Sequence, residues 1–249
     1  MLSSLTLFKL LVAAHIASGS IGLISFWLPV FCHKGGASHI KTGKLFINTM
    51  LITGTVAVLI ATTTLLDPTG THPHLSNHPL FADPANIQGI FGWMMLYLAT
   101  LTINLAWQGR NVMRNRHTPE RNLAWHNLLS QALLTAASAN CLWQGWQINQ
   151  VMMVALSIVG FATVGTNLWY SCKKQPSRAQ RLKEHIKCLV GAGISVYTAF
   201  LAFGAVRLMP ELALTPALWS VPLVTGLTLI IHHQRAVALQ FSKAPALQT

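Results

Sequence analysis

The chain has 249 residues, of which 52% are hydrophobic and only 9% are charged, whereas soluble domains carry roughly 25% charged residues. Apolar stretches of about 20 residues recur along its whole length, and each is long enough to cross the hydrocarbon core of a bilayer, so an ordinary soluble domain is excluded. The net charge of +12 does not predict a nucleic-acid partner, because the basic residues lie in the short gaps between the apolar stretches.

The apolar runs and the polar residues between them predict seven transmembrane helices in a single domain that covers residues 1–249. We therefore expect an all-α, polytopic integral membrane protein. The segment between the second and third spans, residues 67–86, contains four prolines and is not expected to be helical throughout. The predicted spans are Leu5–Val30, Lys44–Leu66, Ile87–Trp107, Asn122–Trp146, Ile148–Tyr170, His185–Arg207 and Glu211–His233.

Lysine and arginine are distributed very unequally between the two sides of these spans. Fifteen of them lie in the gaps after the first, third and fifth spans or after the last span, and only Lys9 and Arg207 lie near the other face. Because cytoplasmic loops carry an excess of lysine and arginine, we predict an outside N-terminus and a cytoplasmic C-terminus. The expected partners are the lipid bilayer and, through the basic gap at residues 173–187, other membrane subunits.

Eleven histidines are unusual in a chain with five acidic residues, and imidazole is a common transition-metal ligand. His39, His126 and His185 lie at the cytoplasmic ends of predicted spans, as do His232 and His233. We interpret the first three as candidate ligands of haem b or a transition-metal ion, in a protein of membrane electron transfer or metal handling. The alternative is that each imidazole caps a helix or contacts lipid phosphate.

A second histidine pattern, H-x-H-x-x-x-H, lies in the proline-rich segment outside the membrane. In an extended loop, His72, His74 and His78 are spaced to bind copper or zinc together. No cysteine or carboxylate lies within the run to complete the coordination, so an ordinary solvated loop is the alternative interpretation.

Near the predicted membrane midplane, His15 lies at about the same height as Tyr97 and Tyr197. A polar group at this depth needs a partner, so a buried network of His15 with one of the tyrosines is expected. Such a network suits a second function, a carrier or channel for a small solute. A third is a non-catalytic assembly or signalling subunit. Motifs of P-loop nucleotide hydrolases, serine esterases and zincin proteases are absent, and the sequence assigns no reaction.

Two parts of the chain resemble a family of uncharacterised bacterial heptahelical proteins, known as predicted membrane proteins of unknown function. The first part is HIASGSIGLISFWLP followed by a short KGG loop and HIKTGKLF, and the second is EHIKCLVGAGISVYTAFLAFGA. The resemblance implies a bacterial inner-membrane location and marks His15, His39, Gly43 and His185 as the positions that match the family pattern. It implies no reaction.

Overall fold

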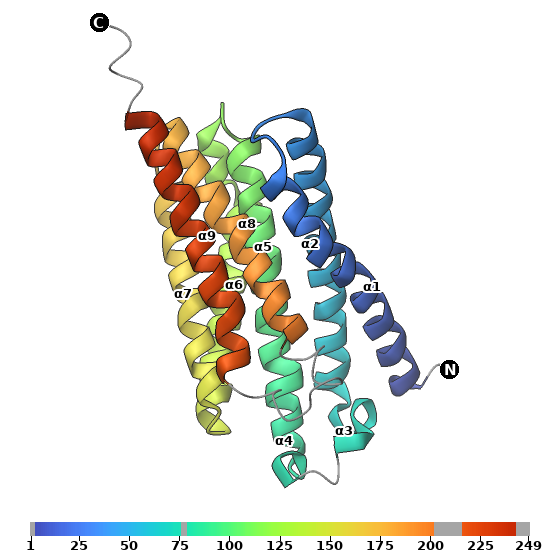
Figure 1. The fold of residues 1–249 in the computed structure, drawn as a ribbon. Helices are drawn as coiled ribbons and strands as arrows, with labels where there is room; N and C mark the ends of the chain where they lie inside the picture. Colours follow the sequence, from blue (N-terminus) through green and yellow to red (C-terminus); the bar gives the residue numbers. More distant parts are fainter. Residues whose placement is uncertain (1–2, 76–78, 202–215, 243–249) are drawn as a thin grey trace, which may run out of the picture.

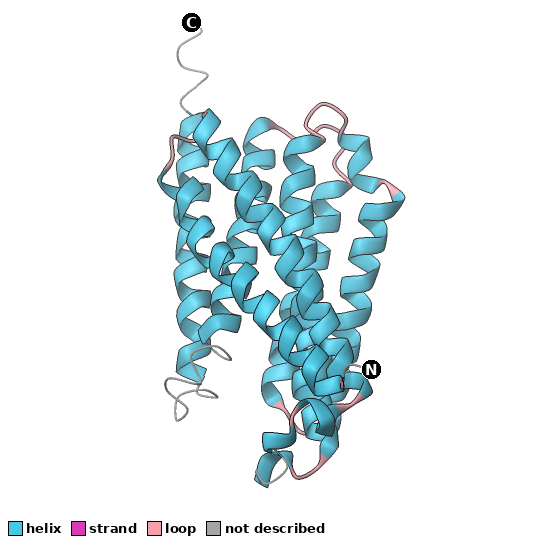
Figure 2. Ribbon diagram, turned by 90° about the vertical axis from the view of Figure 1, so that its right-hand side faces the viewer, coloured by secondary structure: helices cyan, strands magenta, loops and turns pink. Residues whose placement is uncertain are grey.

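The computed structural model describes residues 3–75, 79–201 and 216–242, and every regular element in these ranges is helical (Figures 1 and 2), which confirms the all-α prediction. The long helices are α1 (Ser4–Phe31), α2 (Ala37–Leu66), α5 (Met95–Arg114), α6 (Trp125–Gln147), α7 (Val151–Ser171), α8 (Arg178–Ala199) and α9 (Pro216–Ser242). The short ones are α3 (Pro68–Thr71), η1 (Pro73–Leu75), η2 (Pro79–Phe81), α4 (Pro84–Ile87), the π-helical η3 (Gln88–Met94) and η4 (Pro119–Leu123).

Four helical stretches in the described part of the chain are long and apolar enough to cross a membrane: Ser4–Phe31, Ala37–Leu66, Pro84–Arg114 and Val151–Ser171. Large apolar side chains point outward from the bundle, among them Phe31 and Leu66, which are about 80% exposed. Such a surface is stable against lipid and unfavourable in water. The chain therefore has the character of an integral membrane protein. The described parts of α6, α8 and α9 are not among the helices that are long and apolar enough to cross a membrane.

Two of the long helices begin several residues earlier than the hydrophobic pattern predicts, because local signals, a capping box in α8 and a chain reversal before α2, set their first residue. α8 begins at Arg178, where Ser177 and Gln180 form a reciprocal capping box. α2 begins at Ala37, directly after a reversal in which Gly35 has a φ of +80°, a conformation that costs glycine no steric strain. The first turns of both helices are therefore polar and lie at one end of the bundle.

The segment between α2 and α5 is broken into short helices, as its prolines predict. Asp67 and Asp83 each cap the helix that follows them, by accepting a hydrogen bond from a backbone N–H, and a proline occupies the first helical position in both cases. Two of the five acidic residues therefore have a local structural role outside the predicted spans.

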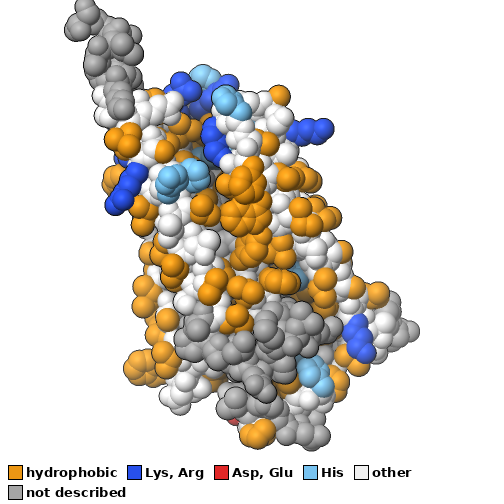
Figure 3. All heavy atoms as spheres, viewed as in Figure 1, with side chains coloured by type: hydrophobic (Ala, Val, Ile, Leu, Met, Phe, Trp, Pro, Cys, Tyr) orange, Lys and Arg blue, Asp and Glu red, His pale blue; other side chains and the backbone are white. Residues whose placement is uncertain are grey.

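α5 is the central helix of the bundle: α2, α6 and α8 all pack against it, while α1 packs on α2, α7 on α6 and α9 on α8 (Figure 1). The turns that join α1 to α2, α5 to α6 and α7 to α8 lie at the same end of the bundle. On the face seen in Figure 3, lysine and arginine gather at this end, and apolar side chains cover much of the described surface between it and the opposite end. We call it the basic end.

Close packing of α7 depends on Gly160 and not on Gly165 of the same helix. A Cβ atom at Gly160 would lie 2.8 Å from Cε2 of Tyr97 and would also collide with the hydroxyl of Ser138, whereas a Cβ atom at Gly165 would meet nothing within 4 Å. Gly160 therefore lets α7 approach α5 and α6, as small residues do in membrane helix pairs.

We expect Gly160→Ala to destabilise the protein by about 1–3 kcal/mol, because the added methyl group overpacks a fixed contact. Gly165→Ala is the matched control, since it makes the same change on the same helix in open space and should be neutral or stabilising by up to about 1 kcal/mol. Thermal unfolding in detergent measures both. Equal melting temperatures of the two variants would contradict the packing described here.

Candidate functional site

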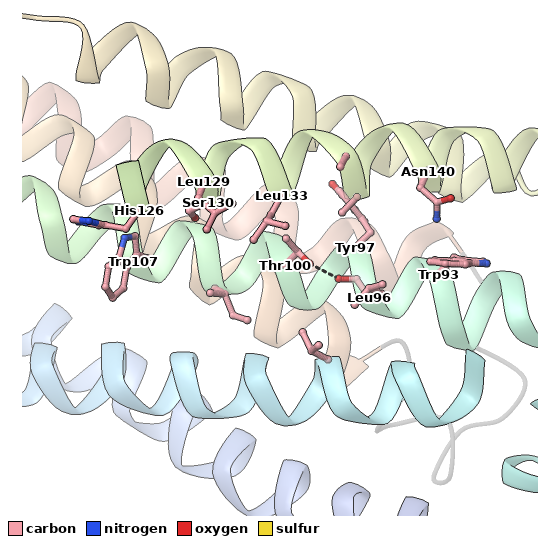
Figure 4. A pocket seen from close by; sticks show the side chains of 14 residues that line it. Trp93, Leu96, Tyr97, Thr100, Trp107, His126, Leu129, Ser130, Leu133 and Asn140 are labelled. Atoms are coloured by element: carbon pink, nitrogen blue, oxygen red, sulfur yellow. Dashed lines mark hydrogen bonds between the residues drawn. The ribbon is translucent and has the colours of Figure 1, made fainter. Parts of the chain in front are cut away.

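A groove of about 670 Å³ runs along the bundle between α5 and α6, with Val58 of α2 at its edge (Figure 4). Each helix contributes one stripe of side chains, spaced three or four residues apart, so each stripe lies on a single helix face. From η3 and α5 the groove is lined by Trp93, Leu96, Tyr97, Thr100, Ile103 and Trp107, and from α6 by His126, Leu129, Ser130, Leu133, Ala137 and Asn140 among others.

Each stripe contains fifteen residues and so spans fourteen residue steps, from Trp93 to Trp107 and from His126 to Asn140. At the rise of an α-helix this corresponds to roughly 21 Å, most of the thickness of the hydrocarbon core. The middle of the groove is mainly apolar, because the hydroxyl groups of Tyr97 and Thr100 there donate to backbone carbonyls, and the polar groups without such a partner lie toward the ends. This shape fits a linear molecule that lies along the bundle.

The end of the groove nearest the basic end is formed by the imidazole of His126 and the indole of Trp107. The ring of His126 meets Trp107 and Trp125 edge-on, with centroid distances of 6.1 and 5.8 Å. Trp107 is held in place because its Nε1 donates to Oδ1 of Asn127 at 2.8 Å, and Asn111 donates to the same oxygen. His126 makes no hydrogen bond to the described residues, so its ring nitrogens are available to a ligand.

The opposite end of the groove is formed by Asn140 and Trp93, whose side chains face each other in Figure 4. Within the described ranges, neither the Asn140 amide nor the Trp93 indole N–H has a hydrogen-bond partner. Trp93 belongs to the π-helical η3, and π-helical turns within helices are frequent at functional sites.

Behind the groove, a partly exposed lysine forms an ion pair with a buried glutamate. The ammonium group of Lys187 donates to Oε1 of Glu184 at 2.8 Å, to Oγ1 of Thr166 at 2.9 Å and to Oδ1 of Asn167 at 3.0 Å. Glu184 is buried, with 8% of its surface exposed. Sequence reasoning missed this pair, because it began the helix at His185 and left Glu184 in a connecting gap.

The hydrogen bonds of Lys187 continue to the groove through two buried amides. Nδ2 of Asn167 donates to Oδ1 of Asn104 at 2.9 Å, and Nδ2 of Asn104 donates to Oγ of Ser130 at 3.0 Å. Asn104 and Asn167 are almost fully buried, and Ser130 lines the groove. A continuous polar chain therefore joins the Lys187–Glu184 pair to the groove wall.

The predicted helix-end histidines occupy two separate places. Nδ1 of His39 bonds to the carbonyl oxygen of Pro29 at 3.0 Å, and Nδ1 of His185 bonds to the carbonyl oxygen of Gly109 at 2.8 Å. The two imidazoles are close enough to interact electrostatically. His126 instead belongs to the groove. No group of three or more histidine, cysteine or acidic side chains in the described ranges is arranged to hold a metal ion.

The predicted midplane network is not found as a connected set in the described part of the chain. His15 bonds through Nδ1 to the carbonyl oxygen of Thr53 at 3.3 Å, and Tyr97 donates its hydroxyl to the carbonyl oxygen of Leu156. Tyr197 donates to a backbone carbonyl of α1 and accepts a hydrogen bond from Trp27. The three side chains bond to backbone carbonyls of three different helices, α2, α7 and α1. Of the three, only Tyr97 lines the groove.

The outer histidine pattern is divided in the structure. His72 is buried between Phe8 and Phe91, at ring distances of 4.8 Å from each, while His74 is exposed and lies 6.0 Å from it. Burial, together with repulsion from His74, lowers the pKa of His72 to about 4. Its ring thus packs the outer segment against α1 and η3. His78 lies outside the described residues, so the three-ligand hypothesis stays a prediction.

Comparison with known proteins assigns no family to the chain. No protein-family model, no curated protein and no solved structure matches it. The resemblance carried by HIASG, HIKTG and the histidine-led α8 sequence therefore stays a prediction.

Proposed function

We propose that this integral membrane protein binds a linear, lipid-soluble molecule in the groove between α5 and α6. The observation that carries the proposal is the matched pair of stripes, which together form an apolar path of roughly 21 Å with hydrogen-bonding groups toward both ends. Ligand sites have this composition, with a mostly apolar lining and a few polar groups that fix orientation.

The polar groups distinguish this site from a surface that merely contacts bulk lipid. An acyl chain of the bilayer satisfies the apolar middle of the groove but offers nothing to Asn140 or to the indole N–H of Trp93. A polar side chain that faces hydrocarbon without a partner is costly, so such residues in membrane proteins usually serve a function. A molecule with its own polar group can satisfy the apolar lining and these side chains together.

We further propose that all seven long helices span the membrane, with the basic end in the cytoplasm. The distribution of lysine and arginine supports this orientation. Exposed tryptophans support it as well, because Trp143 and Trp146 lie at the opposite end and Trp169 lies at the basic end. The ammonium group of Lys173 lies 3.5 Å from the ring centroid of Trp169. Tryptophans at both ends of a bundle mark the two interfaces of a bilayer.

The orientation is tested by labelling Cys172, the described cysteine with an exposed side chain, which lies at the basic end. We expect a membrane-impermeant maleimide to label it in inverted membrane vesicles and not in intact cells. Gln147→Cys in a Cys172→Ala background is the matched control at the other end, and it should show the opposite pattern. Labelling of Cys172 in intact cells would reverse the proposed topology.

The groove is tested by blocking it with a bulky side chain. We expect Ala136→Trp, which places an indole in the groove, to lower the amount of copurifying lipid-soluble molecule at least tenfold in native mass spectrometry. Ala139→Trp is the control, since Ala139 is equally exposed on α6 but does not line the groove. Equal retention by both variants, or nothing retained by the unmodified protein, would contradict the proposal.

A second candidate function, haem or metal binding, is favoured by the hydrogen bonds of His39 and His185. A backbone carbonyl only accepts, so each Nδ1 carries the proton and each neutral ring keeps its lone pair on Nε2, as in ligating histidines. If the pair binds haem, the purified protein has a Soret band that His185→Ala removes and His126→Ala leaves intact. Absence of both a Soret band and stoichiometric metal would exclude this function.

A further inference from the structure

The polar chain behind the groove has a fixed direction, because it begins at a group that can only donate. A lysine ammonium group has three hydrogen-bond donors and no acceptor. Its contact with Asn167 is therefore made by the amide oxygen of Asn167, as the 3.0 Å bond to Oδ1 records. The amide nitrogen of Asn167 then points away from Lys187 and must donate.

The next hydrogen bonds of the polar chain, from Asn167 to Asn104 and from Asn104 to Ser130, have the same direction. Nδ2 of Asn167 needs an acceptor, so Asn104 presents Oδ1 to it and turns its own Nδ2 toward α6. Nδ2 of Asn104 donates to both the hydroxyl oxygen and the backbone oxygen of Ser130. Lys187 at one end and the backbone oxygen of Ser130 at the other, which only accepts, together fix which way the two amide groups are turned, although an amide by itself fits either way around.

The last member of the chain is Ser130, whose hydroxyl oxygen is occupied as an acceptor. A serine hydroxyl has one hydrogen to donate, and the described residues offer no acceptor for it. Ser130 lines the groove one helical turn from His126, so its hydrogen is free to point toward a groove occupant. The polar chain therefore presents a donor to the ligand.

We infer that the groove selects a molecule with a carbonyl oxygen, as in a ketone, quinone or ester, which accepts a hydrogen bond from Ser130 while its apolar chain runs toward Asn140. This inference rests on the proposed function and specifies its ligand class. His126, one helical turn nearer the basic end, supplies a second polar group beside the carbonyl group of the ligand, which we call its head. The ligand head then lies nearer the basic end of the groove, and the remaining stripe from Ser130 to Asn140 covers roughly 15 Å of chain.

The test compares two probes that differ only in the acceptor: a long-chain methyl ketone and the hydrocarbon of equal chain length. Titration of the purified protein in detergent, followed by native mass spectrometry, gives both dissociation constants. A hydrogen bond of ordinary net strength, about 0.5–1.5 kcal/mol, predicts that the ketone binds about 2- to 12-fold more tightly. Ser130→Ala should bring this ratio to about 1 without changing hydrocarbon binding, and Ser130→Thr, which keeps a hydroxyl, should restore it.

The role of Lys187 is tested by Lys187→Gln, whose amide can present either an oxygen or a nitrogen to Asn167 and so removes one of the two groups that fix the direction. We expect the ketone-to-hydrocarbon ratio to fall, while hydrocarbon binding reports that the groove is still folded. Lys183→Gln is the control, since it removes the same charge from α8 without contacting Asn167, and it should leave the ratio unchanged.

Two results would overturn the inference while leaving the groove a ligand site, and a third would overturn the proposed function as well. If both probes bind equally and Ala136→Trp blocks both, the groove is a ligand site without the proposed selectivity. A preference for the ketone that survives in Ser130→Ala overturns the role of Ser130. If neither probe binds, both the proposed function and this inference fail.

Discussion

The three hydrogen bonds of the Lys187 ammonium group set the arrangement of the polar interior. The ammonium group is partly exposed, and Glu184, Thr166 and Asn167 satisfy all three of its donors. Two of these partners belong to α7 and one to α8 itself, so the group fixes α8 against α7. Through Asn167 and Asn104 it also fixes α5, and the serine at the end of the chain belongs to α6. Four helices are thus joined by hydrogen bonds whose direction is fixed at both ends, by Lys187 and by the backbone oxygen of Ser130.

α5 connects this interior to the groove because the two sets of side chains adjoin on one helix face. Buried amides of α5, including Asn104, Gln108 and Asn111, bond to α6 and α7. The stripe from Trp93 to Trp107 lines the groove beside them, since Asn104 lies one helical turn from both Thr100 and Trp107. The amide hydrogen bonds therefore hold the groove stripe in a fixed orientation relative to α6 and α7. A rigid wall of this kind reduces the entropy that a ligand loses by ordering its site.

Much of the fold is predictable from the sequence, because hydrophobic spacing and helix length are local properties. Each predicted span corresponds to a long helix, and the prolines of residues 67–86 correctly indicate a broken segment. The start of α8 is also predictable from the sequence, since Ser177 and Gln180 form a recognisable capping box. A helix that starts there contains Glu184. The hydrophobic pattern does not indicate this start, because the first turns of α8 contain many charged residues.

The candidate site was predictable only in fragments. His126 stands out by composition, and the spacing from His126 through Ser130, Leu133 and Ala137 to Asn140 identifies one helix face. Which helix that face meets depends on packing angles that a single sequence does not specify. For the same reason, the sequence grouped His126 with His39 and His185 by height alone, whereas the structure separates it from them. Direct contact between Asn104 and Asn167 is likewise a property of the assembled bundle.

The most direct test of the account is an experimental structure of the protein in lipid nanodiscs, at a resolution that separates ligand from annular lipid. We predict continuous density along the α5–α6 groove from Trp107 to Trp93, with its widest part within hydrogen-bond distance of the Ser130 hydroxyl. A groove closed by side chains, or density indistinguishable from the lipid around the rest of the bundle, would contradict the account.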